Sequence, residues 1–215
     1  YSTRQYIQLL FDGAGWSTSY ANFDIQNGTI GTVAVGVTAS IDNVGNGWYR
    51  CKVTATSIIN STAAGLHVVM ANSSSMGYYG SYTGSTSNSV YIFGAQVEQR
   101  SSVGPYQATT TQPITNYQST LVNASINQPR FDHDPVTKEC KGLFIEDATT
   151  NLLTYSEDFG NAAWTKNAIT VFGDFTIAPD GTKSADKLVE TTMADLHYVS
   201  SSSQVFTSGV TYTFS

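Results

Sequence analysis

The sequence predicts an all-β fold, and three observations indicate it. Apolar and polar residues alternate with a period of two in several runs, which is the pattern of strands with one buried face. Turn signals such as Asp12-Gly13 and Asn27-Gly28 separate these runs. Only 12% of the 215 residues are charged while 12% are aromatic, and a disordered chain has the opposite composition. We therefore expect a β-sandwich or a jelly roll.

Five alternating runs carry this prediction. Their inward-facing residues are Ile7, Leu9 and Phe11; Tyr49, Cys51, Val53 and Ala55; Leu66, Val68 and Met70; Tyr91, Phe93, Ala95 and Val97; and Tyr212 with Phe214. Further turns are expected at Gly45-Asn46-Gly47, Asp180-Gly181 and Ser208-Gly209. One stretch, 183–196, has apolar residues at roughly helical spacing, so the pattern alone leaves a helix open there.

The chain divides into three parts by composition. Residues 1–108 and 151–215 are rich in strand signals. Residues 109–150 open with Thr109-Thr110-Thr111-Gln112-Pro113 and hold clustered charge, which is typical of a linker or an extended crossover. Because 1–108 and 151–215 contain strands too short to form cores alone, we expect their apolar faces to pack together or against another copy. We also expect the chain to be a fragment of a longer protein.

Charge and cysteine content exclude several classes of protein. The net charge of −6 and a pI near 4.8, with no basic cluster, argue against a nucleic-acid partner. The sequence has no run of 18 apolar residues, so it predicts no membrane-spanning segment. Cys51 and Cys140 are expected to be free thiols, Cys51 buried on an inward strand face and Cys140 more exposed.

Several motifs are recognisable together. They are Asn151-Leu-Leu-Thr-Tyr-Ser-Glu-Asp-Phe159, Ala163-Trp164-Thr165, Ala178-Pro179-Asp180-Gly181-Thr182, Ala185-Asp186-Lys187-Leu188, Gly47-Trp48-Tyr49-Arg50, Val90–Glu98 and Gly104-Pro105-Tyr106. They resemble a module of tailed-bacteriophage virion proteins, a jelly-roll sandwich similar to carbohydrate-binding domains and found in tail fibres, tail spikes and capsid appendages. The resemblance implies a strand, rather than a helix, at 183–190.

The order of these motifs is unusual for such a module. Segment 1–108 resembles the closing half and segment 151–215 the opening half. Two explanations stay open. The chain holds the end of one module and the start of the next in a tandem array, or the two halves close one sandwich, within the chain or between chains, as in a permuted or swapped oligomer.

The resemblance implies a non-enzymatic virion component on the phage particle surface. It would form homo-oligomers, contact other virion proteins and bind host-surface polysaccharide during host attachment. Two alternatives remain: an architectural spacer or decoration protein without a ligand, and a fragment of a polysaccharide-degrading tail spike.

Exposed aromatic rings beside hydroxyl and amide groups are what sugar binding requires, because a flat ring stacks on a sugar face. The candidate glycan-binding residues are Tyr78, Tyr79 and Tyr82 in one loop, and Trp16 with Tyr20 as a second cluster. The loop is expected to project from one end of the sandwich, with Asn72, Ser81 and Thr83 nearby. The competing interpretation is that these rings pack on the sandwich or on a neighbouring subunit.

Catalytic and metal-binding signals are weak. No nucleophile elbow, phosphate loop or zinc motif occurs. Five acidic residues could supply the carboxylate pair of a glycosidase, but nothing pairs them: Glu98, Glu146, Glu157, Asp158 and Glu190. We expect Gln96 and Glu98 to bond neighbouring backbone, His67 to be an ordinary surface residue and His133 to lie in a polar turn. No cofactor is expected. A structural Ca²⁺ would use Asp174, Asp180 and Asp186.

Overall fold

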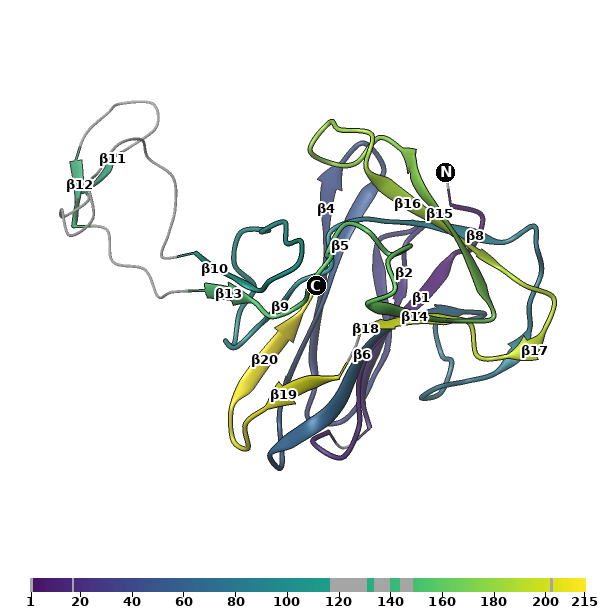
Figure 1. The fold of residues 1–215 in the computed structure, drawn as a ribbon, viewed down its shortest axis with the longest axis horizontal. Helices are drawn as coiled ribbons and strands as arrows, with labels where there is room; N and C mark the ends of the chain where they lie inside the picture. Colours follow the sequence, from purple (N-terminus) through teal and green to yellow (C-terminus); the bar gives the residue numbers. More distant parts are fainter. Residues whose placement is uncertain (1, 17, 117–130, 134–139, 144–148, 202) are drawn as a thin grey trace.

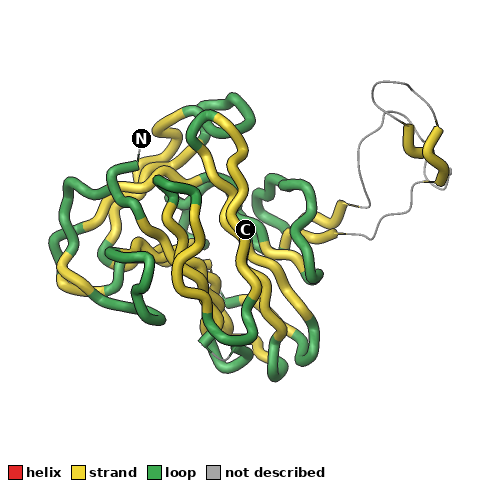
Figure 2. Tube along the Cα trace, turned by 180° about the vertical axis from the view of Figure 1, so that it is seen from behind, coloured by secondary structure: helices red, strands yellow, loops and turns green. Residues whose placement is uncertain are grey.

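The computed structural model describes residues 2–16, 18–116, 131–133, 140–143, 149–201 and 203–215. These residues form twenty strands, and no helix occurs among them, so the predicted all-β class is confirmed (Figures 1 and 2). In the same residues, no helix has the length and apolar character needed to cross a membrane.

All strand pairs are antiparallel. The large sheet has the order β14-β18-β6-β1-β2-β3, with β19 also paired to β6. Its strands are β1 (Tyr6–Asp12), β2 (Ser19–Asp24), β3 (Thr29–Val33), β6 (Ser61–Ala71), β14 (Trp164–Asn167), β18 (Tyr198–Ser201) and β19 (Gln204–Phe206).

Two further sheets contribute to the same core. The facing sheet has the order β4-β5-β20-β9, and the third sheet has the order β15-β16-β8. Their strands are β4 (Thr38–Gly45), β5 (Trp48–Thr56), β9 (Val97–Glu98), β20 (Thr211–Phe214), β8 (Ser89–Ile92), β15 (Ile169–Thr176) and β16 (Ala185–Glu190).

Three short pairs complete the described strands. They are β7 (Tyr82–Thr83) with β17 (Ala194–Asp195), β10 (Ile114–Asn116) with β13 (Thr149–Asn151), and β11 (Phe131–His133) with β12 (Cys140–Leu143). Of the stretch 109–150 expected as a linker, these strands and residues 109–113 are described. The rest of it lies outside the described residues.

One apolar core lies between the large sheet and the facing sheet, which makes the molecule a β-sandwich. Its centre is aromatic. The ring of Phe11 stacks on that of Trp16 at 4.3 Å between centroids, and the ring of Phe206 meets those of Trp16 and Tyr212 edge-on at 4.9 and 4.7 Å. Cys51 is a free, buried thiol in this core, as predicted; the side chain of Cys140 lies outside the described residues.

The two strand-rich segments complete each other within one chain. Strand β6 of the first segment pairs with β1 on one edge and with β18 and β19 of the second segment on the other. Strand β20 lies between β5 and β9, and β16 pairs with β8. The expectation that segments 1–108 and 151–215 bury their apolar faces against each other is therefore confirmed.

Two sequence patterns have clear outcomes. Residues 185–190 form strand β16, so the helical spacing there is misleading. The run from Tyr91 to Val97 was expected to face one way as a single strand, but it is interrupted. Gly94 has φ of 67°, a left-handed conformation that shifts the alternation by one residue. As a result, Ile92 and Ala95 both contact the core.

Candidate functional site

A patch of six half-buried tyrosines lies on the outer face of the large sheet, opposite the core. The rings pack over four buried apolar residues, Leu10, Val69, Ala71 and Met76. The tyrosine patch consists of Tyr6, Tyr20, Tyr78, Tyr79, Tyr82 and Tyr198. The large sheet therefore has apolar side chains on both faces, although only its inner face belongs to the main core.

Two buried amides hold the loop that carries Tyr78 and Tyr79. The Gln8 Nε2 group donates to the Gly77 carbonyl at 3.1 Å, and the Asn22 Nδ2 group donates to the Met76 carbonyl at 2.7 Å. The backbone N–H of Tyr79 donates in turn to Gln8 Oε1 at 3.3 Å. The loop therefore folds onto the sheet, and the expectation that it projects from one end of the sandwich is wrong.

The Asp12 carboxylate joins two tyrosines of the patch. The Tyr78 hydroxyl donates to Asp12 Oδ1 at 2.9 Å and the Tyr79 hydroxyl to Oδ2 at 3.2 Å. Burial, together with this nearby carboxylate, raises the pKa of both tyrosines. Tyr79 has φ of 51°, a conformation that costs about 1 kcal/mol or more in a bulky residue. The Asp12 and Gln8 contacts help to hold Tyr79 in this conformation.

Four rings of the patch form a connected row. Ring centroids are 5.8 Å apart between Tyr20 and Tyr78, 4.9 Å between Tyr78 and Tyr79, and 5.9 Å between Tyr79 and Tyr198. The hydroxyl groups of Tyr20 and Tyr198 at the two ends of the row donate to no other described residue. These two hydroxyls are thus available to a ligand.

His67 lies beneath this row rather than on the surface. Its ring meets those of Tyr79 and Tyr198 edge-on at 5.1 and 4.9 Å, and only 7% of the residue is exposed. Burial lowers its pKa to about 4, although Asp12, 3.6 Å away, opposes the shift. The prediction of an ordinary surface histidine is wrong because the 76–82 loop covers this outward face.

Tyr82 contacts a buried carboxylate. Its hydroxyl donates to Glu190 Oε1 at 2.7 Å, and the Arg4 guanidinium forms an ion pair with the same carboxylate. Ser85 N–H donates to Glu190 Oε2 at 3.1 Å. Burial alone would raise the pKa of Glu190, but these hydrogen bonds and the arginine outweigh it and lower the pKa. Tyr82 is therefore a structural anchor as well as a patch residue.

The second predicted aromatic cluster does not exist as a unit. Trp16 is 6% exposed and lies in the main core, so the prediction that it is a glycan platform is wrong. Tyr20 belongs instead to the tyrosine patch. The burial of Trp16 follows from its stacking on Phe11, the last inward residue of β1. Asn72, Ser81 and Thr83 are exposed, as sugar-contacting groups would have to be.

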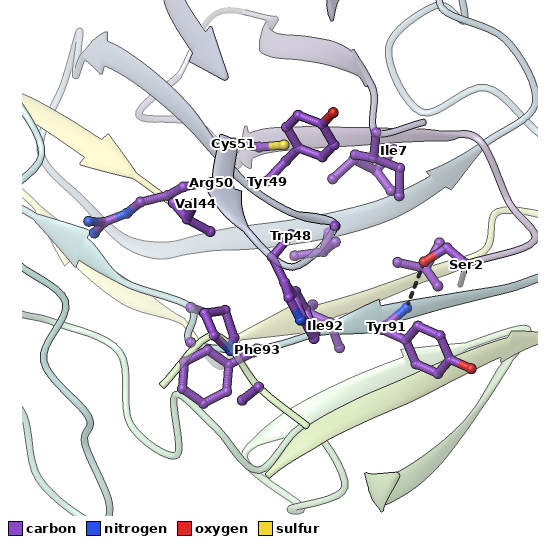
Figure 3. A pocket seen from close by; sticks show the side chains of 18 of the residues that line it. Ser2, Ile7, Val44, Trp48, Tyr49, Arg50, Cys51, Tyr91, Ile92 and Phe93 are labelled. Carbon is purple, nitrogen blue, oxygen red and sulfur yellow. Dashed lines mark hydrogen bonds between the residues drawn. The ribbon is translucent and has the colours of Figure 1, made fainter. Parts of the chain in front are cut away.

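Sequence reasoning did not predict a groove of about 1200 Å³ that opens beside the facing sheet (Figure 3). Trp48, Tyr49 and Arg50 of β5 line one side, and Ile92 and Phe93 line the other. In Figure 3 the Trp48 side chain extends from β5 toward Ile92. Its indole N–H has no hydrogen-bond partner among the described residues. One signal in the sequence could have revealed the groove. The alternating run 49–55 is longer than the run 212–214 that pairs with it, so part of the longer run lacks a partner on that side.

The buried polar pair Gln96 and Glu98 is structural, as predicted. Gln96 Oε1 accepts from Gln107 N–H at 2.8 Å, and Glu98 Oε2 accepts from Gly104 N–H at 2.8 Å. Both side chains therefore bond the backbone of the segment that follows β9.

Two of the calcium candidates are engaged in local structure through their carboxylates. Asp186 accepts backbone hydrogen bonds from Phe159 and Asp174, at 2.9 and 3.0 Å, and Asp180 accepts from Thr182. Within the described part of the chain, no three His, Cys, Asp or Glu side chains group as a metal site would require. The carboxylates of Asp180 and Asp186 thus hold turns and strands together, whereas Asp174 takes part through its backbone N–H. Glu146 and the side chain of His133 lie outside the described residues.

The fold and these two surfaces define the class of protein as an all-β sandwich with an aromatic outer face and an open groove. In comparisons with known proteins, no family model, curated protein or solved structure matches the chain.

Proposed function

We propose that the protein is a non-enzymatic structural component of a bacteriophage particle, in a tail fibre, spike or capsid appendage, and that it contacts host-surface glycan through the tyrosine patch. In this proposal it is a carbohydrate-binding sandwich of jelly-roll type, displayed on the particle surface in a homo-oligomer with other virion proteins.

The row Tyr20–Tyr78–Tyr79–Tyr198 carries the proposal. Aromatic rings provide a large contact area at low entropic cost, and their edges present hydroxyls for hydrogen bonding. Tyr78 and Tyr79 are held by Asp12, and their loop by Gln8 and Asn22. A ligand that stacked on the row would therefore meet side chains that are already ordered.

Two observations favour binding over catalysis. The Glu190 carboxylate is enclosed by Arg4, Tyr82 and Ser85, and Glu98 bonds the Gly104 backbone. A glycosidase needs two carboxyl groups facing the sugar about 5–10 Å apart, and these two carboxyl groups are already bonded by residues of the chain itself. A reducing-sugar release assay on capsular polysaccharide tests the tail-spike alternative; release by the purified protein would contradict the proposal.

A glycan array with the purified chain tests the binding directly. Tyr20→Ala and Tyr198→Ala each remove a ring whose hydroxyl holds no described residue, so the fold should persist. We expect each change to weaken binding of the glycan identified on the array by at least about tenfold, with the melting temperature within a few degrees of the parent.

Tyr91→Ala is the matched control, because Tyr91 is another half-buried tyrosine but lines the groove. It should leave glycan binding unchanged. Loss of binding with Tyr91→Ala and not with the patch variants would assign the glycan to the groove and contradict the proposal. If the purified chain binds no glycan, the architectural alternative is supported instead. Its mass in solution by light scattering tests the expected oligomer.

A further inference from the structure

Among the described residues, two carboxylates contact tyrosines of the patch, and a cation of the chain completes one of these contacts. The Tyr82 hydroxyl donates to Glu190 Oε1 at 2.7 Å, and Arg4 Nε donates to the same oxygen at 2.6 Å. The Arg4 guanidinium also lies over the Tyr82 ring, 5.0 Å from its centroid. A cation in this position is attracted by the aromatic face as well as by the carboxylate.

The second contact has tyrosine donors of the same kind but no cation from the described residues. The hydroxyls of Tyr78 and Tyr79 donate to the two oxygens of Asp12, at 2.9 and 3.2 Å. No lysine or arginine in the described part of the chain forms an ion pair with Asp12. His67 Nε2 lies 3.6 Å from Asp12 Oδ2, but burial lowers the pKa of His67 to about 4, so this ring is neutral near pH 7.

The elements around Asp12 carry no positive charge of their own. Strands β1, β2, β6 and β18 contain no lysine or arginine, and neither does the segment 72–84 that includes the tyrosine loop. Burial and the contact with Asp12 raise the pKa of Tyr78 and Tyr79, and no described basic side chain opposes the rise. The row of tyrosines therefore surrounds a negative charge that the described side chains leave unbalanced.

The Asp12 carboxylate can still be reached from solvent. Its side chain is 43% exposed, and its neighbour on β6 is Gly65, which has no side chain to cover it. A carboxylate has about four lone-pair positions, and the two tyrosine hydroxyls use two of them. The Tyr78 and Tyr79 rings meet at 78°, with 4.9 Å between their centroids. A compact cation beside this corner of rings can therefore contact the carboxylate and an aromatic face together.

We propose that the tyrosine patch recognises its glycan through an organic ammonium group, which pairs with Asp12 and lies against the rings of Tyr78 and Tyr79. This inference rests on the proposed function and names the class of glycan that the patch takes, one with a free amino sugar or a quaternary ammonium substituent. Both present the charge that a carboxylate and aromatic faces attract. A neutral glycan has no counterpart to Asp12, and an anionic glycan is repelled by it.

The first test uses the unmodified chain and two matched pairs of small probes, at about pH 6 so that an amine is protonated. Choline is compared with 3,3-dimethylbutan-1-ol, in which carbon replaces the charged nitrogen. Methyl glucosaminide is compared with methyl N-acetylglucosaminide, whose nitrogen is neutral. Tyrosine ring resonances are followed by NMR during each titration.

We expect a cationic probe to shift the ring resonances of Tyr78 and Tyr79 and to bind at least about tenfold more tightly than its neutral counterpart. The pair that shows this preference identifies the source of the ammonium group. Equal affinities within both pairs, or binding that leaves these two rings unshifted, would overturn the proposal.

The second test removes the charge. Asp12→Asn keeps the size of the side chain, and we expect it to weaken binding of the cationic probe at least about tenfold. The matched control is Asp42→Asn, which removes the same charge from β4, where Asp42 is 56% exposed and pairs with Lys52. It should change the affinity less than about twofold. Equal losses in the two variants would assign the effect to the net charge of the chain and overturn the proposal.

The Tyr79 amide resonance reports whether the loop stays in place in Asp12→Asn. If the loop shifts, the comparison of probes on the unmodified chain decides, since it involves no substitution.

The glycan array separates a failure of this inference from a failure of the proposed function. Binding of neutral glycans that is lost in Tyr198→Ala and retained in Asp12→Asn would overturn ammonium recognition and leave the proposed function intact. A cationic preference among the small probes without any glycan bound on the array would overturn the proposed function and support the ammonium site. Selective binding of glycans with amino or choline groups supports both.

Discussion

The Tyr82 hydroxyl donates to Glu190 across 108 residues of sequence, at 2.7 Å. This bond connects the loop of the first strand-rich segment to the end of β16 in the second. Asn88 and Arg4 contact the same carboxylate, so the first segment meets Glu190 from several directions. The contact fixes one edge of the tyrosine patch to the third sheet.

Loss of that hydroxyl should destabilise the fold. Tyr82→Phe removes a hydrogen bond to a buried charged group, and we expect it to lower the free energy of unfolding by about 1.5–3 kcal/mol. Tyr91→Phe removes a hydroxyl that bonds no described residue and should change it by less than about 0.5 kcal/mol. Urea denaturation of both variants checks this; equal midpoints would contradict the role of the bond.

His67 should make stability depend on pH. Its pKa is about 4 in the folded chain and about 6.5 when exposed, so the unfolded chain binds more protons between these values. Stability from this group is therefore complete above pH 6.5 and is lost as the pH falls to 4, by up to about 3 kcal/mol. In His67→Gln, the urea midpoint should change less with pH across that window than it does in the parent. If the midpoint of the variant changes with pH as steeply as that of the parent, other groups cause the pH dependence.

Two glycines offer a matched pair. A Cβ at Gly84 would lie 2.2 Å from the Thr191 carbonyl oxygen and 2.4 Å from His197 Cε1, whereas one at Gly77 would meet nothing within 4 Å. We expect Gly84→Ala to cost about 2 kcal/mol or more, because backbone must move. Gly77→Ala should cost less than about 0.5 kcal/mol. Thermal unfolding measures both, and comparable losses would contradict the packing around Gly84.

Cys51 should be chemically inert in the folded chain. Burial raises the pKa of its thiol, and the thiolate is the reactive form. In a Cys140→Ser background, a thiol reagent at pH 8 should modify the native chain at least about 100-fold more slowly than the chain in urea. Rapid native modification, followed by mass spectrometry, would show that the groove exposes Cys51.

The strands could be predicted from the sequence, but the segments that cover their outer faces could not. Alternation correctly placed Leu9, Val53 and Val68 in the core, because a period of two is a local property of a half-buried strand. It also placed His67 on the outward face but could not show that the Tyr78–Tyr79 loop covers that face. The loop is held by Gln8 and Asn22, whose contacts with it depend on tertiary structure.

The same limit applies to the candidate sites. A tyrosine-rich loop is visible in the sequence, but the connection of Tyr78 to Tyr20 and of Tyr79 to Tyr198 needs three separate segments to meet. The groove beside the facing sheet was missed because residues of several separate segments line it, and no residue type marks it in the sequence. Trp16 was misassigned because the local sequence, an aromatic residue beside glycines, does not distinguish an exposed ring from one stacked on Phe11.

The position of β6 and β5 has a consequence for how the chain acquires its structure during synthesis. Their partners β18, β19 and β20 lie more than a hundred residues downstream. Until the ribosome has delivered these last strands, β6 and β5 each keep a hydrogen-bonding edge open and a face of the core uncovered. Such distant pairings fold slowly, so the nascent N-terminal segment keeps an aggregation-prone edge and face exposed until they form.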